Sequence, residues 1–212
     1  MPESYDVLFV SSNVHKYEEA YEILSVPNTN PNIRLKLGFF QTDLEEIQDD
    51  SLLIIAAQKA LDAYRKCKEP VIVEDDGLFI DSLSGFPGQF SSYVFKTIGN
   101  KGILKLMGRD IQASVKDAAG IRPEGRDAQF VAIIAFCDSN LKPWLFSSSI
   151  DGTISPKIKG KGWGYDPIFI PEAQGGRTYA QLAEKNLKNK AYVSHRTESL
   201  RKFADWFKNK QE

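Results

Sequence analysis

The first strong signal for the fold is the segment VLFVSSN, residues 7–13. Its four apolar residues form a compact run that is typical of a buried strand. The polar end, residues 11–13, is made of residue types that cap helices well. Apolar side chains then recur at positions 17, 20, 21 and 24, which is helical spacing. The segment therefore predicts a strand, a polar turn and a helix.

The rest of the chain continues this alternation and then adds pairs of strands. Alternating apolar residues predict a half-buried strand at 33–39, and a second helix is expected to begin near Asp50 or Ser51. The apolar face of that helix is predicted at Leu53, Ala57, Ala60 and Tyr64. The further elements expected are a short buried strand at 71–73, a helix at 99–107, a surface connection at 109–127, a strand at 130–136 with a hairpin partner at 144–149, a loop-rich region at 151–176 around the apolar run 168–170, and a closing helix with Leu200, Phe203, Ala204 and Phe207 inward. This order predicts an α/β (α+β) fold with a mixed sheet, in a single domain over residues 1–212.

Composition limits the kinds of partner. The formal net charge of -1 provides no global basic field for nucleic acid, so a polyanionic ligand must be held by local charges and a metal. Cys67 and Cys137 are too few for a disulfide framework or a four-ligand zinc site, and we interpret them as reduced thiols of a cytoplasmic protein. No segment approaches the length of a membrane span, and the apolar stretch near the N-terminus is too short for a signal peptide.

The clearest chemical signal is Glu74-Asp75-Asp76-Gly77, which follows the apolar run 71–73. Three ionised carboxylates in a dry site repel one another, and a hard cation such as Mg²⁺ removes that cost. An extended chain would place Glu74 and Asp76 on one side and Asp75 on the other, which leaves one carboxylate to take a proton from water. An acidic turn before a glycine explains the same residues equally well.

The turn at residues 11–16 is a second candidate. Free backbone N–H groups at a helix start attract anions, and Lys16 adds a full positive charge. The turn would cradle a triphosphate, or it is an ordinary N-cap with a solvated lysine; it lacks the glycines of a Walker loop. Asp43, Glu45 and Glu46 either complete a metal shell or begin a solvated loop.

The segment GWGYDP, residues 162–167, has the composition of a pocket for a planar base. Its glycines allow the backbone to approach a ligand closely. Trp163 or Tyr165 would stack on a purine, and Asp166 would accept hydrogen bonds from ring N–H groups. A core-packed aromatic loop is the alternative.

Ser194-His195-Arg196 opens the region of the last helix, and His195 and Arg196 could donate hydrogen bonds to the 6-keto oxygen of such a base, although a lone histidine is more often structural. His15 is the only other histidine, so a multi-histidine metal site is excluded. A Ser-His-Asp hydrolase lacks its Gly-x-Ser-x-Gly elbow here. Residues 85–88, GFPG, are interpreted as a rigid structural turn.

Taken in order, these motifs resemble the inosine triphosphate pyrophosphatase family, also called Ham1-like, which hydrolyses noncanonical purine nucleoside triphosphates. The matched segments are residues 11–19, 44–48, 73–78 continuing to 85–88, 163–169, 178–180 and 194–196. They span nearly the whole chain, and the ordered set is far more specific than any one segment.

The resemblance implies a long twisted mixed β-sheet with flanking helices in two lobes, a nucleotide cleft between the lobes, and a homodimer. It assigns Mg²⁺ to Glu46 and Asp75, with Asp75 as the base for the attacking water. It assigns the triphosphate to Ser11, Ser12, Asn13 and Lys16, with Lys59 and Asp76 lining the phosphate region, and the base to Trp163, Gly164, Tyr165, Asp166, His195 and Arg196. It also implies a substrate-binding lysine, Lys190.

The sequence departs from the family pattern in three places. Asp76 stands where the family has Ser or Thr, which adds a negative charge beside the phosphates. Trp163 replaces a phenylalanine and keeps the ability to stack. The family's Lys-Asn pair matches Lys190 by spacing and Lys185 by identity, and reach along the chain favours Lys190.

The expected activity is hydrolysis of ITP, dITP and XTP to the monophosphate and pyrophosphate. Two alternatives remain. One is a pyrophosphatase for other modified nucleotides; the other is a purine-nucleotide binding protein without turnover, in which Asp76 spoils the site.

Overall fold

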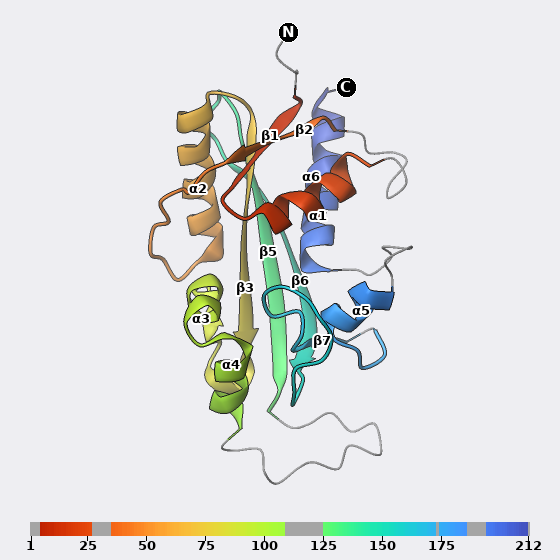
Figure 1. Ribbon diagram of the computed structural model, residues 1–212. Coiled ribbons are helices and arrows are strands. Elements are labelled where there is room, and N and C mark those ends of the chain that lie inside the picture. The colour runs from red at the N-terminus through yellow and green to blue at the C-terminus, as the bar shows by residue number, and fades with distance from the viewer. Residues whose placement is uncertain (1–4, 27–34, 109–124, 173, 186–193, 212) are drawn as a thin grey trace. The chain divides into compact units, whose positions relative to one another are not determined.

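A computed structural model describes residues 5–26, 35–108, 125–172, 174–185 and 194–211 of the 212-residue chain (Figure 1). The strands are β1 (Val7–Ser11), β2 (Leu37–Gln41), β3 (Val71–Ile80), β4 (Pro87–Gly88), β5 (Asp127–Cys137), β6 (Trp144–Ile154) and β7 (Phe169–Pro171). The helices are α1 (Val14–Leu24), α2 (Leu52–Cys67), α3 (Ser91–Thr97), α4 (Gly99–Met107), α5 (Tyr179–Lys185) and α6 (His195–Gln211), with a 3-10 turn η1 (Asp81–Leu83). Among the described helices, none is both long enough and apolar enough to cross a membrane.

The strands form one mixed sheet in the order β2-β1-β3-β5-β6-β7, and β4 pairs with β3. β1 runs parallel to β2 and β3, whereas the β3–β4 and β6–β7 pairs are antiparallel. In the described part of the chain the sheet is open, and helices flank it. The α/β fold class with a mixed sheet is therefore confirmed.

The chain divides into two compact units, each made of separate segments. Unit 1 contains residues 1–75, 132–148 and 193–212, and unit 2 contains residues 76–131 and 149–192. The three long strands β3, β5 and β6 each contribute residues to both units.

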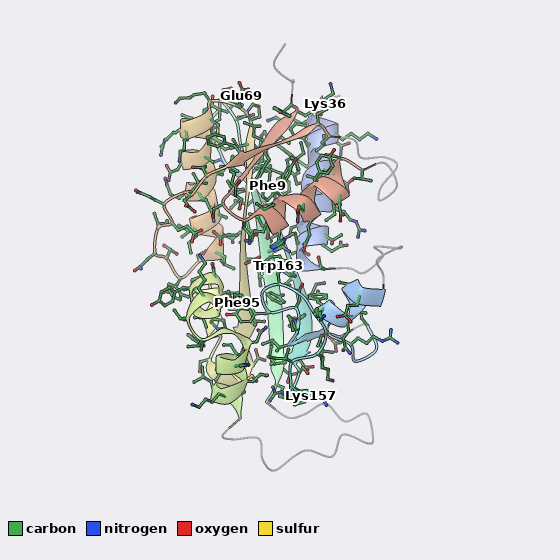
Figure 2. All side chains as sticks on the ribbon, viewed as in Figure 1. Phe9, Lys36, Glu69, Phe95, Lys157 and Trp163 are labelled. Atoms are coloured by element: carbon green, nitrogen blue, oxygen red, sulfur yellow. The ribbon has the colours of Figure 1, made fainter. Side chains whose placement is uncertain are left out.

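The core of unit 1 lies where α1 and α6 cover one face of the sheet, side by side (Figure 1). Phe9, labelled in Figure 2, and Ile72 supply this core from β1 and β3, and Phe203 supplies it from α6. All four predicted inward residues of the closing helix are buried. Tyr21 of α1 is instead 44% exposed, because the buried face of that helix runs through Ala20 and Leu24.

Helix α2 begins after Ser51, as predicted, and Ala60 of the predicted face is buried, but the prediction that Leu53 faces inward was wrong. The buried side chains are those of Leu52, Ile55, Ala56, Ala60 and Ala63, and Leu53 is 45% exposed. Four consecutive apolar residues at 52–55 leave the phase of the helical repeat ambiguous, so the sequence alone did not fix which of them faces inward.

The prediction that β3 stops before the carboxylates was also wrong. The strand continues through residues 74–77, and Leu78 and Phe79 then pair with Gly88 and Pro87 of β4. Burial of Leu78 and Ile80 in the core of unit 2 explains the continuation. The acidic residues therefore lie within the strand, where side chains alternate between its two faces.

Several boundaries differ from the prediction in smaller ways. β6 extends to Ile154, inside the region expected to be loop, because Gly152 pairs with Pro171 of β7. The expected strand at 33–39 is observed as β2, which ends at Gln41, two residues after the expected end. Residues 33–34 lie outside the described part. Most of the expected surface connection, residues 109–124, also lies outside it. Helix 99–107, strand 130–136 and its partner β6 are confirmed, and Cys67 and Cys137 are free thiols.

Truncating Phe203 should destabilise the protein strongly. The side chain is fully buried and its ring stacks on Phe136, so Phe203→Ala is expected to cost about 3–5 kcal/mol of unfolding free energy. Urea denaturation followed by circular dichroism measures this. Tyr93→Ala is the control, because the tyrosine is 69% exposed, and should change the unfolding free energy by about 0.5 kcal/mol or less. Equal losses in the two variants would contradict the assignment of the core.

Candidate functional site

The turn between β1 and α1 is shaped by its own side chains. The Ser11 hydroxyl oxygen accepts a hydrogen bond from the Asn13 N–H at 3.0 Å. Asn13 Oδ1 accepts one from the His15 N–H at 3.0 Å and so caps α1. Ser12 is exposed between them. The turn is thus an N-cap, and it presents the positive end of α1 on unit 1.

Lys16 shows that this cap is not an ordinary one. Its side chain is only 13% exposed, and its Nζ lies 3.5 Å from Glu74 Oε1. The alternative of a solvated lysine is therefore wrong. A nearly buried cation stands one turn into α1, close to the carboxylate that precedes Asp75.

Glu74 is the centre of a buried ion-pair network. Arg196 Nε donates to both of its carboxylate oxygens, at 2.7 and 2.8 Å, and the Glu74 side chain is fully buried. Arg196 Nη1 also donates to Glu19 Oε2 at 2.6 Å. With Lys16, the network holds two carboxylates and two cations from β3, α1 and α6. Each charge thereby has an opposite charge, which buried charges require.

His195 and Arg196 are placed by the start of α6. The Ser194 hydroxyl oxygen accepts from the Thr197 N–H at 3.1 Å, which caps the helix. Both His195 and Arg196 are 4% exposed. Since Arg196 binds Glu74 and Glu19, its main visible role is to join α6 to β3 and α1.

Asp75 faces the opposite side of β3, as the alternation of an extended chain requires. There its Oδ2 lies 3.5 Å from Nζ of Lys59, which projects from α2. The same ammonium donates to Oε1 of Glu46, from the loop before α2. Lys59 therefore brings together the two carboxylates that the resemblance assigns to a metal.

The donor set near Lys59 suits a hard cation. Both carboxylates supply oxygen, and an ammonium already lies between them, so positive charge is accommodated at this position. Among the described residues no group of three His, Cys, Asp or Glu side chains gathers into a metal site. Mg²⁺ does not need one, because it is commonly held by one or two carboxylates together with substrate phosphates and water. Glu46 and Asp75 fit that pattern.

In unit 2, Tyr165 belongs to the core rather than to an open surface. Its ring packs edge-on against Phe95 and near Phe130, and its hydroxyl donates to the Ser91 carbonyl at 2.9 Å. Burial, with the Asp76 carboxylate adding to it, raises the pKa of the Tyr165 phenol above its ordinary value. With the ring packed in this way, Trp163 is the better candidate for stacking on a base.

The remaining aromatic-segment residues form a tight turn around Tyr165. Trp163 is half-buried, and its carbonyl accepts from the Asp166 N–H at 3.3 Å. Gly164 has φ +58, a left-handed value that favours glycine. The Asp166 carbonyl accepts from the Ala180 N–H at 3.1 Å, which ties the turn to α5. Figure 2 labels Trp163 and Phe95 in this unit.

Three positions considered in the sequence add little here. Lys190 lies outside the described residues, and Lys185 is the last residue of α5. Asp76 is the first residue of unit 2 and is half-buried.

Sequence reasoning missed Glu74 and Glu19 as partners of Arg196. The spacing of Lys16 and Glu19 places them on one face of α1, which was a usable signal. The partnership between β3 and α6 joins residues 122 positions apart, and no local pattern contains it.

Comparisons with known proteins agree with the motifs. The model of the Ham1 family matches residues 7–206. A protein named dITP/XTP pyrophosphatase from Methanopyrus kandleri is 41% identical over 204 residues, 96% of each chain, and one from Korarchaeum cryptofilum is 39% identical over 94% of this chain and 95% of its own. A HAM1 protein structure from Coxiella burnetii aligns with TM-score 0.71 at 25% identity, covering 96% of this chain and 98% of its own. The resemblance drawn from the sequence is confirmed.

Removing the Glu74 carboxylate should destabilise unit 1. Glu74→Ala leaves Arg196 and Lys16 buried without their shared counter-charge, so a loss of about 3–5 kcal/mol in unfolding free energy is expected. Urea denaturation measures it. Asp62→Ala is the matched control, since it breaks the exposed pair with Arg65 and should cost about 1 kcal/mol or less. A Glu74→Ala protein as stable as the Asp62→Ala protein would refute the network.

Proposed function

Because this chain belongs to the Ham1 family, we propose that it hydrolyses noncanonical purine nucleoside triphosphates, dITP, ITP and XTP, to the monophosphate and pyrophosphate. The relatives named dITP/XTP pyrophosphatase support the substrate class. The observation within the chain that carries the proposal is the group formed by Asp75, Lys59 and Glu46, in which two carboxylates share one cationic neighbour at a buried strand.

We propose that the reaction depends on Mg²⁺, with Glu46 and Asp75 as its protein ligands. When bound, the ion would offset the negative charge of the phosphate oxygens and of the departing pyrophosphate. A homodimer, which rests on the family resemblance, and a cytoplasmic location, which rests on the free thiols Cys67 and Cys137, are further parts of the proposal.

The residues of unit 1 have distinct roles in this proposal. Asp75 accepts the proton of the water that attacks the α-phosphorus, and its buried position beside Lys59 keeps it oriented. Lys59 and Lys16 bind phosphate oxygens as cations, and the N-terminus of α1 adds its backbone N–H groups. The ion pair with Glu74 holds the Lys16 side chain in place.

In unit 2, Trp163 stacks on the purine and Asp166 accepts hydrogen bonds from its ring N–H groups. The family resemblance assigns the donor to the 6-keto oxygen to His195 of unit 1. Adenine presents an amino donor at that position, so two donors would face each other. Leaving such buried groups unpaired costs about 1–3 kcal/mol each, which disfavours ATP.

Pyrophosphate release from a panel of triphosphates tests the function. ITP, dITP and XTP should be turned over in the presence of Mg²⁺, ATP should be turned over about tenfold less well or worse, and chelation of the metal should abolish release. Turnover of modified pyrimidine nucleotides instead would identify a different pyrophosphatase. Binding of ITP by calorimetry without any release would identify a binding protein.

Asp75→Asn should lower kcat for ITP by at least about a hundredfold, because it removes the proton acceptor while keeping the shape of the side chain. Steady-state kinetics measures this. Asp43→Asn is the matched control, since Asp43 is an exposed acid of the loop that carries Glu46, and it should retain wild-type kcat. Near-normal turnover by Asp75→Asn would remove Asp75 from its role.

A further inference from the structure

Besides the backbone bond from Ala180 to Asp166, two long-range side-chain hydrogen bonds hold the aromatic turn at residues 163–166 within unit 2. The Tyr165 hydroxyl donates to the Ser91 carbonyl of α3 at 2.9 Å, and Asn100 Nδ2 of α4 donates to the Gly164 carbonyl at 3.0 Å. Ser91 is itself fixed, because its hydroxyl accepts from the Leu78 N–H and donates to the Gly88 carbonyl. The turn is therefore tied to α3, α4 and, through Ser91, to β3.

Only the nitrogen of the Asn100 side-chain amide makes a hydrogen bond within the described residues. Since a carbonyl can only accept, the nitrogen must face Gly164, and the amide oxygen faces away. That oxygen is buried, and no hydrogen-bond partner for it exists among the residues that the structure describes. A buried acceptor without a partner costs stability that the single bond to Gly164 does not clearly recover. The bond to Gly164 is therefore the one side-chain hydrogen bond that the structure shows for Asn100, and the buried oxygen offsets part of its contribution to stability.

The bond to Gly164 acts on the residue of the turn whose backbone is least restrained by packing. Gly164 has φ +58, and a Cβ built on it would meet nothing within 4 Å, so packing does not hold this residue. A glycine in such a turn can rotate the peptide plane that follows it at little cost. By binding the Gly164 carbonyl, Asn100 fixes that plane between Trp163 and Asp166.

We infer that Asn100 is a positioning residue for base discrimination, which holds the peptide of Gly164 so that Trp163 and Asp166 keep the geometry needed to select a 6-keto purine. This inference rests on the proposed function for its substrate. It assigns a specificity role to α4, a helix that carries none of the family motifs.

Asn100→Ala separates this role from a structural one. The change removes the donor and the partnerless acceptor together, so the thermal midpoint should fall by no more than about 2 °C. The ratio of kcat/KM for ITP to that for ATP should fall by about tenfold or more, with KM for ITP rising more than kcat falls. Asn100→Asp, which keeps the shape but loses the donor, should lower the ratio at least as far. Asn140→Ala, at an exposed turn of unit 1, is the matched control and should keep the wild-type ratio.

A second readout does not require turnover. In a protein with Trp144→Phe and Trp206→Phe, Trp163 is the only tryptophan. Acrylamide should quench its fluorescence more strongly after Asn100→Ala, because the turn is released. After Asn140→Ala the quenching constant should stay the same as before that substitution. A wild-type protein that hydrolyses no purine triphosphate would end the proposed function while leaving this readout to decide whether Asn100 holds the turn. An unchanged quenching constant overturns the inference, and so does an unchanged ITP-to-ATP ratio in an active enzyme, whatever happens to the thermal midpoint.

Discussion

The buried carboxylate of Glu74 is the contact on which the arrangement of unit 1 depends. It binds Arg196 through both oxygens and lies beside Lys16, so it joins the strand to α6 and α1. Because neighbouring side chains of a strand face opposite ways, fixing Glu74 on the α1 and α6 side sends Asp75 to the side of Lys59. A slip of β3 by one residue would exchange the two carboxylates. The parallel pairing of Phe9 with Ile72 sets that register.

Neighbouring acids on one strand would repel each other strongly if they shared a face. Here the strand separates the charges, and each face supplies its own cations. Arg196 and Lys16 serve Glu74, and Lys59 serves Asp75. A metal is therefore not required to offset the charges of Glu74 and Asp75, contrary to what the sequence pattern first suggested.

The sequence was informative where a local pattern and its physical cause coincide. The cap at Asn13, the start of α2 after Ser51 and the buried face of α6 all followed from spacing and residue type. It was misleading where a long-range contact overrides the local pattern. β3 passes through its acidic residues because Leu78 and Ile80 have a second core to enter. Likewise, Tyr165 looks like a ligand-stacking residue until its partners on α3, 70 or more residues away, are known.

The way the chain is divided has a consequence for how this protein can change over time. Neither compact unit is a continuous stretch of sequence, and β3, β5 and β6 each cross from one to the other. Cleavage of the chain at one position would not separate the two units. A gene encoding only one unit would have to join segments that are separate in the sequence. An exchange of one contiguous half of the chain would therefore replace parts of both units together.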